Sequence, residues 1–248
     1  MDDSHEFHQL AQGPPFRNLQ GHLLQQLGQW IVSGGVAPGE ALPIEPEIAA
    51  QFHVSKTVVR EAIRGLAAKG MVQTRTRLGT RVRPRDDWHV LDPDVLTWQL
   101  GSEPDQDFLR DFEEFRYAVE PTAARIAAER ARPMALRSIQ AALERMQASI
   151  DDPDAYFTAD LDFHVAILTA TDNRLLRGLR DAVRAALTVR HTNVAPVVHD
   201  MRESLPYHER LAAALSSGQP DEAVAAARDL LALTERDDAR LSGRRRRQ

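Results

Sequence analysis

The sequence predicts a mainly α-helical protein: an N-terminal winged helix-turn-helix, made of three helices and a β-hairpin wing, joined to an all-α helical bundle. Apolar residues recur at helical spacing through most of the chain, and two short β-branched segments around a turn interrupt that pattern after residue 70. Charge is divided unevenly as well. Residues 15–85 contain ten basic and four acidic residues, a net charge of +6, so the rest carries −11 of the total of −5. This asymmetry is expected when only the first module meets phosphate.

Composition narrows the class of protein. The 248 residues are enough for two domains of ordinary size. We expect a cytoplasmic protein with no membrane partner, because no apolar stretch could cross a bilayer and the acidic start lacks the features of a secretory signal. The absence of cysteine excludes disulfides, thiolate zinc sites and cysteine nucleophiles, which leaves histidine and carboxylates as strong metal ligands.

The N-terminal elements follow from periodicity and end signals. Three helices are expected at residues 19–32, 45–52 and 55–69. Ser55 can cap the third helix by accepting from its free amides, and Gly70 ends it. The hairpin is expected from strands at residues 71–75 and 79–83, with Gly79 at its tip. Two short helices joined by a tight turn and followed by a hairpin predict a winged helix-turn-helix.

From Asp92 onward the sequence predicts no strand. Helices are expected at residues 93–101, 105–131, 133–150, 153–171, 173–191, 200–217 and 220–241. The whole chain therefore divides into an N-terminal arm (1–16), the winged helix-turn-helix (17–84), a linker with a connecting helix (85–104), the helical domain (105–241) and a basic tail (242–248).

The start of the third helix has the chemistry of a DNA-reading surface. Recognition helices place their N-terminal side chains against base edges, and the polar residues there are Ser55, Lys56, Thr57 and Arg60. The alternative is that these residues are only a helix cap and solvated charges. The arginine-rich hairpin beside them favours DNA contact.

Three segments of this region, residues 42–49 (LPIEPEIA), 54–62 (VSKTVVREA) and 66–72 (LAAKGMV), resemble the signature of the GntR family of regulators. The resemblance implies that an operator faces Ser55, Lys56, Thr57, Val58 and Arg60, and that Gly79 lies at the wing tip in the minor groove. The further candidate DNA contacts are Glu45, Arg64, Arg75, Arg77 and Thr80. Pro46 departs from the pattern, because many members have a DNA-contacting arginine there. Lys56 or a wing arginine would have to replace that contact.

A candidate metal site lies in the helical domain. Asp160 and His164 are four residues apart, so they share one helix face and could reach one ion, and His208 lies on a later helix. The alternative is a hydrogen-bonded surface pair without a metal.

The segments 116–124, 160–164 and 218–223 resemble the FCD ligand-binding domain of the FadR-like branch. In metal-binding members of this branch an Asp and three His hold a divalent ion, and the matching positions are Asp160, His164, His208 and Leu230. Leucine cannot bind a metal. The resemblance therefore implies either a three-ligand site for Zn²⁺, Ni²⁺ or Mn²⁺ that water or an effector completes, or the loss of the metal.

Residues 88–98 resemble the branch of galactonate-type sugar-acid operon repressors. This resemblance implies an effector that is a small organic or sugar acid, and the candidate effector-binding residues are Arg116, Glu120 and Arg190. Arg116 could grip a carboxylate through its two-pronged guanidinium, or it could form a salt bridge with Glu120 one turn further on.

Three interpretations compete at this point. The first is a transcriptional repressor that is controlled by an effector and binds palindromic double-stranded operator DNA as a homodimer. The second is a metal-dependent hydrolase or lyase that activates water with Asp160, His164 and His208. The third is a simple metal sensor, which the loss of a fourth ligand disfavours. No general-base motif is evident, and an enzyme would leave the basic module without a purpose, so we expect no catalytic residues.

Overall fold

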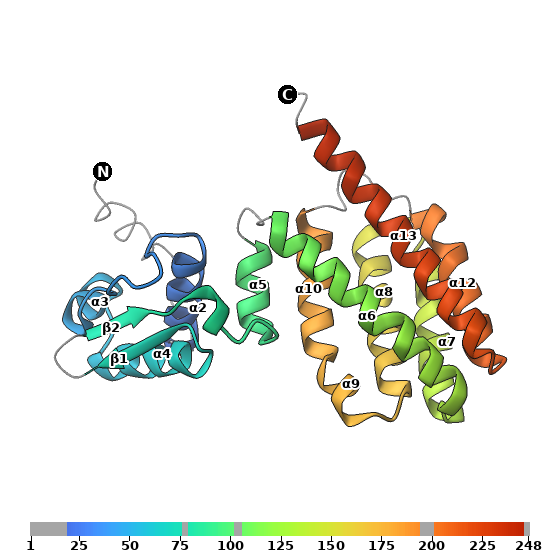
Figure 1. The fold of residues 1–248 in the computed structure, drawn as a ribbon, viewed down its shortest axis with the longest axis horizontal. Coiled ribbons are helices and arrows are strands. Elements are labelled where there is room, and N and C mark those ends of the chain that lie inside the picture. Colours follow the sequence, from blue (N-terminus) through green and yellow to red (C-terminus); the bar gives the residue numbers. More distant parts are fainter. Residues whose placement is uncertain (1–18, 76–78, 102–105, 194–200, 246–248) are drawn as a thin grey trace. The chain divides into compact units, whose positions relative to one another are not determined.

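A computed structural model describes residues 19–75, 79–101, 106–193 and 201–245. The chain divides into two compact units, residues 1–104 and 105–248. None of the helices in the described ranges is long and apolar enough to cross a membrane. Figure 1 gives the order of the elements.

The first unit has the predicted winged helix-turn-helix. Its elements are α2 (Leu19–Val32), α3 (Glu45–Gln51), α4 (Lys56–Ala68), β1 (Val72–Arg75) and β2 (Gly79–Val82). The strands pair antiparallel, from Val72 opposite Val82 to Arg75 opposite Gly79. Ser55 caps α4 as expected, since its side chain accepts from the Val58 amide. Gly70 has a φ of +75°, the left-handed conformation that lets the chain leave α4 and enter the hairpin.

The segment after the hairpin joins the core of the first unit. It contains a short 3₁₀ helix, η1 (Arg85–Asp87), and α5 (Pro93–Gly101). Trp88, Val95 and Trp98 are buried in the same apolar cluster as the inner face of α2. Gly28 of α2 makes this possible, because a Cβ there would lie 2.4 Å from the Trp98 ring. The connecting helix is thus a packed part of the first unit.

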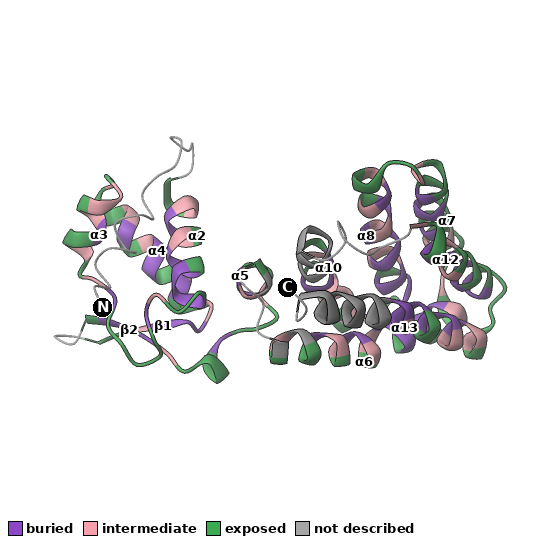
Figure 2. Cartoon of the chain, turned by 90° about the horizontal axis from the view of Figure 1, so that it is seen from above, coloured by how far each residue is buried: buried purple, intermediate pink, exposed green. Residues whose placement is uncertain are grey.

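The second unit is all helical, as predicted. Its helices are α6 (Gln106–Arg130), α7 (Pro133–Ala148), α8 (Pro153–Ala170), α9 (Arg174–Gly178), α10 (Arg180–Asn193), α12 (Met201–Ser216) and α13 (Pro220–Arg245). Figure 2 shows that their buried faces turn inward. Many of the buried residues are alanines, which let helices approach closely and leave room for larger polar side chains between them.

Most of the predicted helices begin and end within two residues of their bounds in the structure, and two differ by more. The helix expected at 173–191 is divided into α9 and α10. Gly178 has low helix propensity, and the Leu179 amide donates to the Leu176 carbonyl, a tighter turn than an α-helix allows. Helix α13 continues to Arg245, beyond the expected end at 241.

Candidate functional site

The DNA-reading candidates on α4 lie at its exposed N-terminal end. Lys56, Thr57 and Arg60 are exposed, whereas Val58 is half-buried and packs against the core of the first unit. Their exposure and the cap at Ser55 give this end of α4 the form expected of a recognition helix.

Two ion pairs hold arginines of α4. The Arg60 Nε donates to Glu45 Oε2 at 2.8 Å, a contact between α4 and the first residue of α3. Arg64 instead pairs with Glu61, three residues earlier on the same helix. Glu45 therefore reaches the candidate DNA face through Arg60.

The candidate DNA contacts in the wing differ in how exposed they are to solvent. Arg75 is exposed at the end of β1, opposite Gly79, whose φ is +75°. Thr80 is buried, and its hydroxyl is 3.0 Å from that of Thr74. Arg77 lies outside the described residues.

Several basic residues near the wing are engaged within the first unit. Arg81 donates to the Gly39 carbonyl, Arg83 pairs with Asp87, and Arg85 donates to the Val32 carbonyl. Of these three, only Arg83 has its charge paired with a carboxylate. The spacing of charges along the sequence gave no sign of these contacts.

The structure brings the three candidate metal ligands together. Asp160 and His164 lie one turn apart on α8, and His208 lies on α12. One ligand atom of each residue lies within 4.8 Å of the others, and both histidines are buried. Asp160 Oδ1 is 2.8 Å from His208 Nε2 and 3.6 Å from His164 Nε2. Small side-chain rotations would bring these atoms to one ion, whose bonds to such ligands are about 2 Å long.

Hydrogen bonds orient both imidazole rings. His208 Nδ1 is 2.9 Å from the Ser204 carbonyl, which can only accept, so Nδ1 carries a hydrogen. His164 Nδ1 is 2.9 Å from Glu120 Oε2. Both rings thus turn Nε2 toward Asp160. His208 Nε2 is buried without a well-formed hydrogen bond despite its short distance to Asp160. This donor set fits a divalent cation, because backbone and carboxylate partners of this kind orient metal-binding histidines.

The cluster is strongly polarised. Burial alone would lower the pKa of His164, but Glu120 and Asp160 together raise this pKa to about 10. Burial would raise the pKa of Glu120, but Arg116 and His164 lower it to about 2. The pKa of Asp160 is also held well below its usual range, because His164 and His208 outweigh burial. The carboxylates are thus ionised and favour a positive charge between them.

Arg116 and Glu120 form the salt bridge that the sequence left as an alternative. Arg116 is 2% exposed, and its Nε donates to Glu120 Oε1 at 2.7 Å. Its Nη1 is buried without a hydrogen-bond partner, 3.5 Å from a Glu113 carboxylate oxygen. The two oxygens of Glu120 are each used, one by Arg116 and one by His164. The side chain of Arg190, the third effector candidate, lies outside the described residues.

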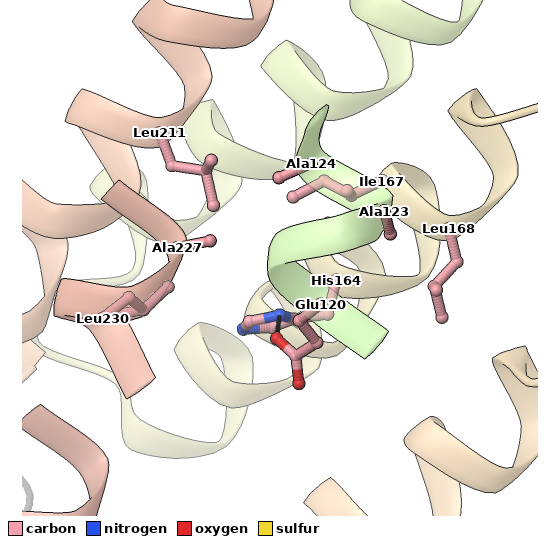
Figure 3. A pocket seen from close by; sticks show the side chains of 9 residues that line it. All are labelled: Glu120, Ala123, Ala124, His164, Ile167, Leu168, Leu211, Ala227 and Leu230. Atoms are coloured by element: carbon pink, nitrogen blue, oxygen red, sulfur yellow. Dashed lines mark ion pairs between the residues drawn. The ribbon is translucent and has the colours of Figure 1, made fainter. Parts of the chain in front are cut away.

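A small pocket adjoins this cluster (Figure 3). Glu120 and His164 form its polar side, and Leu230 of α13 lies on the opposite side with Ala227 and Leu211. Its free volume, about 10 Å³, admits about one water molecule. Leu230, the position matched to a fourth ligand, gives the site an apolar wall.

Sequence reasoning missed a polar pair beneath the cluster. The hydroxyls of Tyr156 and Ser204 are 2.8 Å apart and buried. Each residue precedes a candidate ligand by one helical turn, Tyr156 on the helix of Asp160 and Ser204 on that of His208. That four-residue spacing was the available signal. The pair links α8 to α12, and the Ser204 carbonyl orients His208.

A winged helix-turn-helix and an all-helical unit with a buried charged cluster, joined in one chain, define a two-domain DNA-binding regulator. The pattern of the bacterial regulatory proteins of the gntR family matches residues 19–82, and that of the FCD domain matches residues 111–233. The chain belongs to the GntR family and has an FCD domain. Members of this family bind operator DNA, and FCD domains bind small-molecule effectors and are often associated with metals.

Named relatives agree with this class. The chain is 37% identical to the galactonate operon transcriptional repressor of Escherichia coli over 67% of this chain and 72% of that protein. It is 31% identical to the HTH-type transcriptional regulator YieP of E. coli over 87% of this chain and 93% of that protein. These relatives are regulators, which disfavours the enzyme interpretation.

Solved structures share the fold. One is the structure of Lar, a protein that controls the expression of the Listeria monocytogenes agr system. It aligns with a TM-score of 0.65 and 20% identity. The alignment covers 92% of this chain and 100% of that one. E. coli McbR/YncC aligns with a TM-score of 0.53 and 18% identity, over 92% of this chain and 99% of the other.

Proposed function

We propose that this regulator is a repressor whose affinity for its operator is controlled by a small carboxylic or sugar acid bound in the second unit. The observation that carries the proposal is the buried Arg116 guanidinium beside the Asp160, His164 and His208 cluster, whose Nη1 has no hydrogen bond and only a 3.5 Å ion pair with Glu113. A buried, unsatisfied arginine donor is costly and suits a carboxylate partner. The 37% identity to a galactonate operon repressor supports a sugar acid.

Glu120 has a different task from the one expected of it. Both its oxygens are engaged, so we assign it to positioning rather than direct effector contact. It holds the Arg116 guanidinium from one side and fixes the His164 ring from the other. A ligand that engages Arg116 is therefore linked through one carboxylate to the metal-ligand candidates.

We propose that Asp160, His164 and His208 hold a divalent cation such as Zn²⁺, Ni²⁺ or Mn²⁺. When bound, the cation would supply a Lewis-acidic partner for carboxylate and hydroxyl oxygens of the effector. Leu230 offers no fourth ligand, and its apolar side chain borders the pocket. The pocket admits about one water, so a sugar acid requires the surrounding helices to move. That movement is the natural source of an allosteric signal.

The DNA-binding role belongs to residues 17–84, and the effector role to residues 105–241. The segment 85–104 between them would transmit the signal. A homodimer would present two α4 helices to a palindromic operator, because the symmetry of the DNA site mirrors that of the protein. Arg60→Ala should weaken operator binding about tenfold or more while leaving effector affinity intact.

The test is a calorimetric titration of the purified chain with galactonate and related aldonates, with and without Zn²⁺. The thermal unfolding of the chain is measured with the same acids. We expect heat and a thermal shift for one aldonate, and their loss in Arg116→Met. If no aldonate produces heat or a thermal shift with any of the three metals, the sugar-acid proposal fails. DNA binding is measured in parallel and tests the regulator function separately.

A further inference from the structure

The contact between Arg60 and Glu45 carries an inference about how the DNA sequence is read. It rests on the proposed role of α4 as the recognition helix. We propose that Glu45 is a positioning residue that holds Arg60 so that its two terminal nitrogens face a guanine of the operator. Sequence discrimination at that base pair would then depend on a residue of α3 as well as on α4.

The geometry of α3 makes Glu45 a fixed partner. Glu45 is the first residue of α3, and Pro46 follows it within the first turn, where proline is preorganised for a helix. The first turn is also held by the Ile44 amide, which donates to Glu47 Oε2 at 3.1 Å. Glu45 Oε2 accepts from Arg60 Nε across fifteen residues of sequence. The contact therefore connects two separately anchored helices.

Stability does not account for this pair. The side chains are 61% and 35% exposed, and ion pairs this exposed contribute little to folding. A long arginine side chain in water samples many rotamers, so a contact at Nε mainly restricts where the guanidinium points. Restricting it before DNA binds lowers the entropy lost on binding.

Glu45 binds one nitrogen of the Arg60 guanidinium, which determines which nitrogens are left to contact DNA. With Nε directed at the carboxylate, Nη1 and Nη2 stay available at the exposed end of the guanidinium. Two parallel N–H donors match the O6 and N7 acceptors that guanine presents in the major groove. Glu45 also places a negative charge near the phosphates, which weakens binding to DNA in general. Its expected signature is higher discrimination together with lower non-specific affinity.

Arg64 and Glu61 provide a matched control on the same helix. They also form an exposed arginine–carboxylate pair, but both partners belong to α4 and lie three residues apart. Glu61→Gln removes the same charge as Glu45→Gln without freeing Arg60. A difference between these two variants therefore reports the orientation of Arg60, since the change in net charge is the same.

The experiment begins with selection of bound duplexes from a randomised DNA library by the full chain. Fluorescence anisotropy at fixed salt then measures binding to the selected duplex and to copies in which each guanine in turn is replaced by 7-deazaguanine, which lacks N7, or by adenine. The guanine whose replacement no longer matters in Arg60→Ala is the one that Arg60 reads. Thermal unfolding verifies that all variants are folded.

We expect the unaltered chain and Glu61→Gln to prefer that guanine to adenine by about tenfold or more. Glu45→Gln should reduce the preference to about threefold or less and tighten binding to unselected DNA. The inference is wrong if Glu45→Gln keeps the full preference for that guanine. It is also wrong if binding by Arg60→Ala still depends on every guanine on which binding by the unaltered chain depends. If the unaltered chain enriches no sequence, the DNA-binding function itself fails.

Discussion

Single residues decide the chemistry of the second unit. Arg116, Glu120, His164 and His208 are polar residues buried in a bundle core that is otherwise largely alanine and leucine. Buried charges are tolerated when each is paired, and here the pairs form a chain from Arg116 through Glu120 and His164 to Asp160. Such a chain links the candidate carboxylate site to the candidate metal site.

Glu120→Gln should weaken metal binding by about 10- to 100-fold, because an orienting partner one step from the ion is altered. The amide retains an acceptor but loses the charge that holds the His164 ring. Calorimetric titration with Zn²⁺ measures the change. Glu114→Gln, an exposed change on the same helix, is the control and should bind Zn²⁺ as the unaltered chain does. Equal affinity in both variants would contradict the positioning role.

His208→Ala should abolish most Zn²⁺ binding, since it removes one of three ligands, and the loss should be larger than that caused by Glu120→Gln. His53→Ala, at an exposed histidine of the first unit, is the control for non-specific binding to imidazoles. Atomic absorption after dialysis gives the bound metal directly. Undiminished metal content in His208→Ala would rule out this cluster as the site.

At the residue scale the sequence predicted part of the site. Asp160 and His164 could be placed together because four residues make one helical turn. His208 was a candidate on a later helix, but only the resemblance to a family implied that it lies beside the other two, since no spacing shows where α12 packs. The engagement of Glu120 by both Arg116 and His164, and the Tyr156–Ser204 pair, depend on which helices are neighbours. Sequence periodicity does not give that information.

At the scale of elements, α5 is joined to α4. Lys69, the C-cap of α4, pairs with Asp92 at 2.8 Å and with Asp94 at 2.7 Å. Asp92 also accepts from the Asp94 and Val95 amides, so it caps α5. One lysine thus joins the end of α4 to the start of α5. The sequence predicted a linker at residues 85–104. It gave no sign that Trp88 and Trp98 of this segment pack against the core of the first unit.

Lys69→Met should destabilise the first unit by about 1 to 3 kcal/mol, since it removes charged hydrogen bonds from a half-buried site. Burial lowers the pKa of Lys69, but Asp92 and Asp94 raise it above the usual 10.5. A raised pKa means that the stabilisation is complete below about pH 10.5 and is lost as pH rises through the folded value. Urea unfolding at pH 8 and pH 11.5 measures the free energy of unfolding of the unaltered chain and of Lys69→Met. If the difference between the two proteins is the same at both pH values, the role of the charged lysine is contradicted.

Gly28→Ala should loosen α5 from α2, because the added Cβ would lie 2.4 Å from the buried Trp98 ring. The expected cost is about 1 to 3 kcal/mol, typical of overpacking. Gly101→Ala adds the same methyl at the end of α5, where it meets open space, and should cost nothing comparable. Tryptophan fluorescence during urea unfolding compares them. Equal stability of the two variants would show that α5 is not packed closely at Gly28.

The division of 173–191 into α9 and α10 shows where element-scale prediction stops. Helical periodicity continues across Gly178, so a single helix was the expected outcome. The Asn173 side chain accepts from two amides at the start of α9, and the short helix ends five residues later. Asn173 begins this helix, and the tight turn after Gly178 ends it, although the apolar pattern continues.

At the scale of the whole molecule, charge separates the two functions. Residues 15–85 carry a net charge of +6 and the rest of the chain −11, which directs DNA to the winged helix-turn-helix and away from the FCD domain. Three arginines near the wing make internal contacts, two with backbone carbonyls and one with Asp87, and these contacts set where the side chains point. Fold class was predictable from the sequence because periodicity and end signals are local, whereas the pairing of these arginines is not.

The central claim is that one chain couples sequence-specific DNA binding to a small acid bound beside Arg116. The most direct test is a mobility shift of the full chain on its selected operator, at fixed salt with Zn²⁺, with and without galactonate and related aldonates. We predict a specific complex that one acid dissociates, and an Arg116→Met complex that the same acid leaves intact. A specific complex that every acid leaves unchanged would contradict the effector claim, and the absence of any specific complex would contradict the account as a whole.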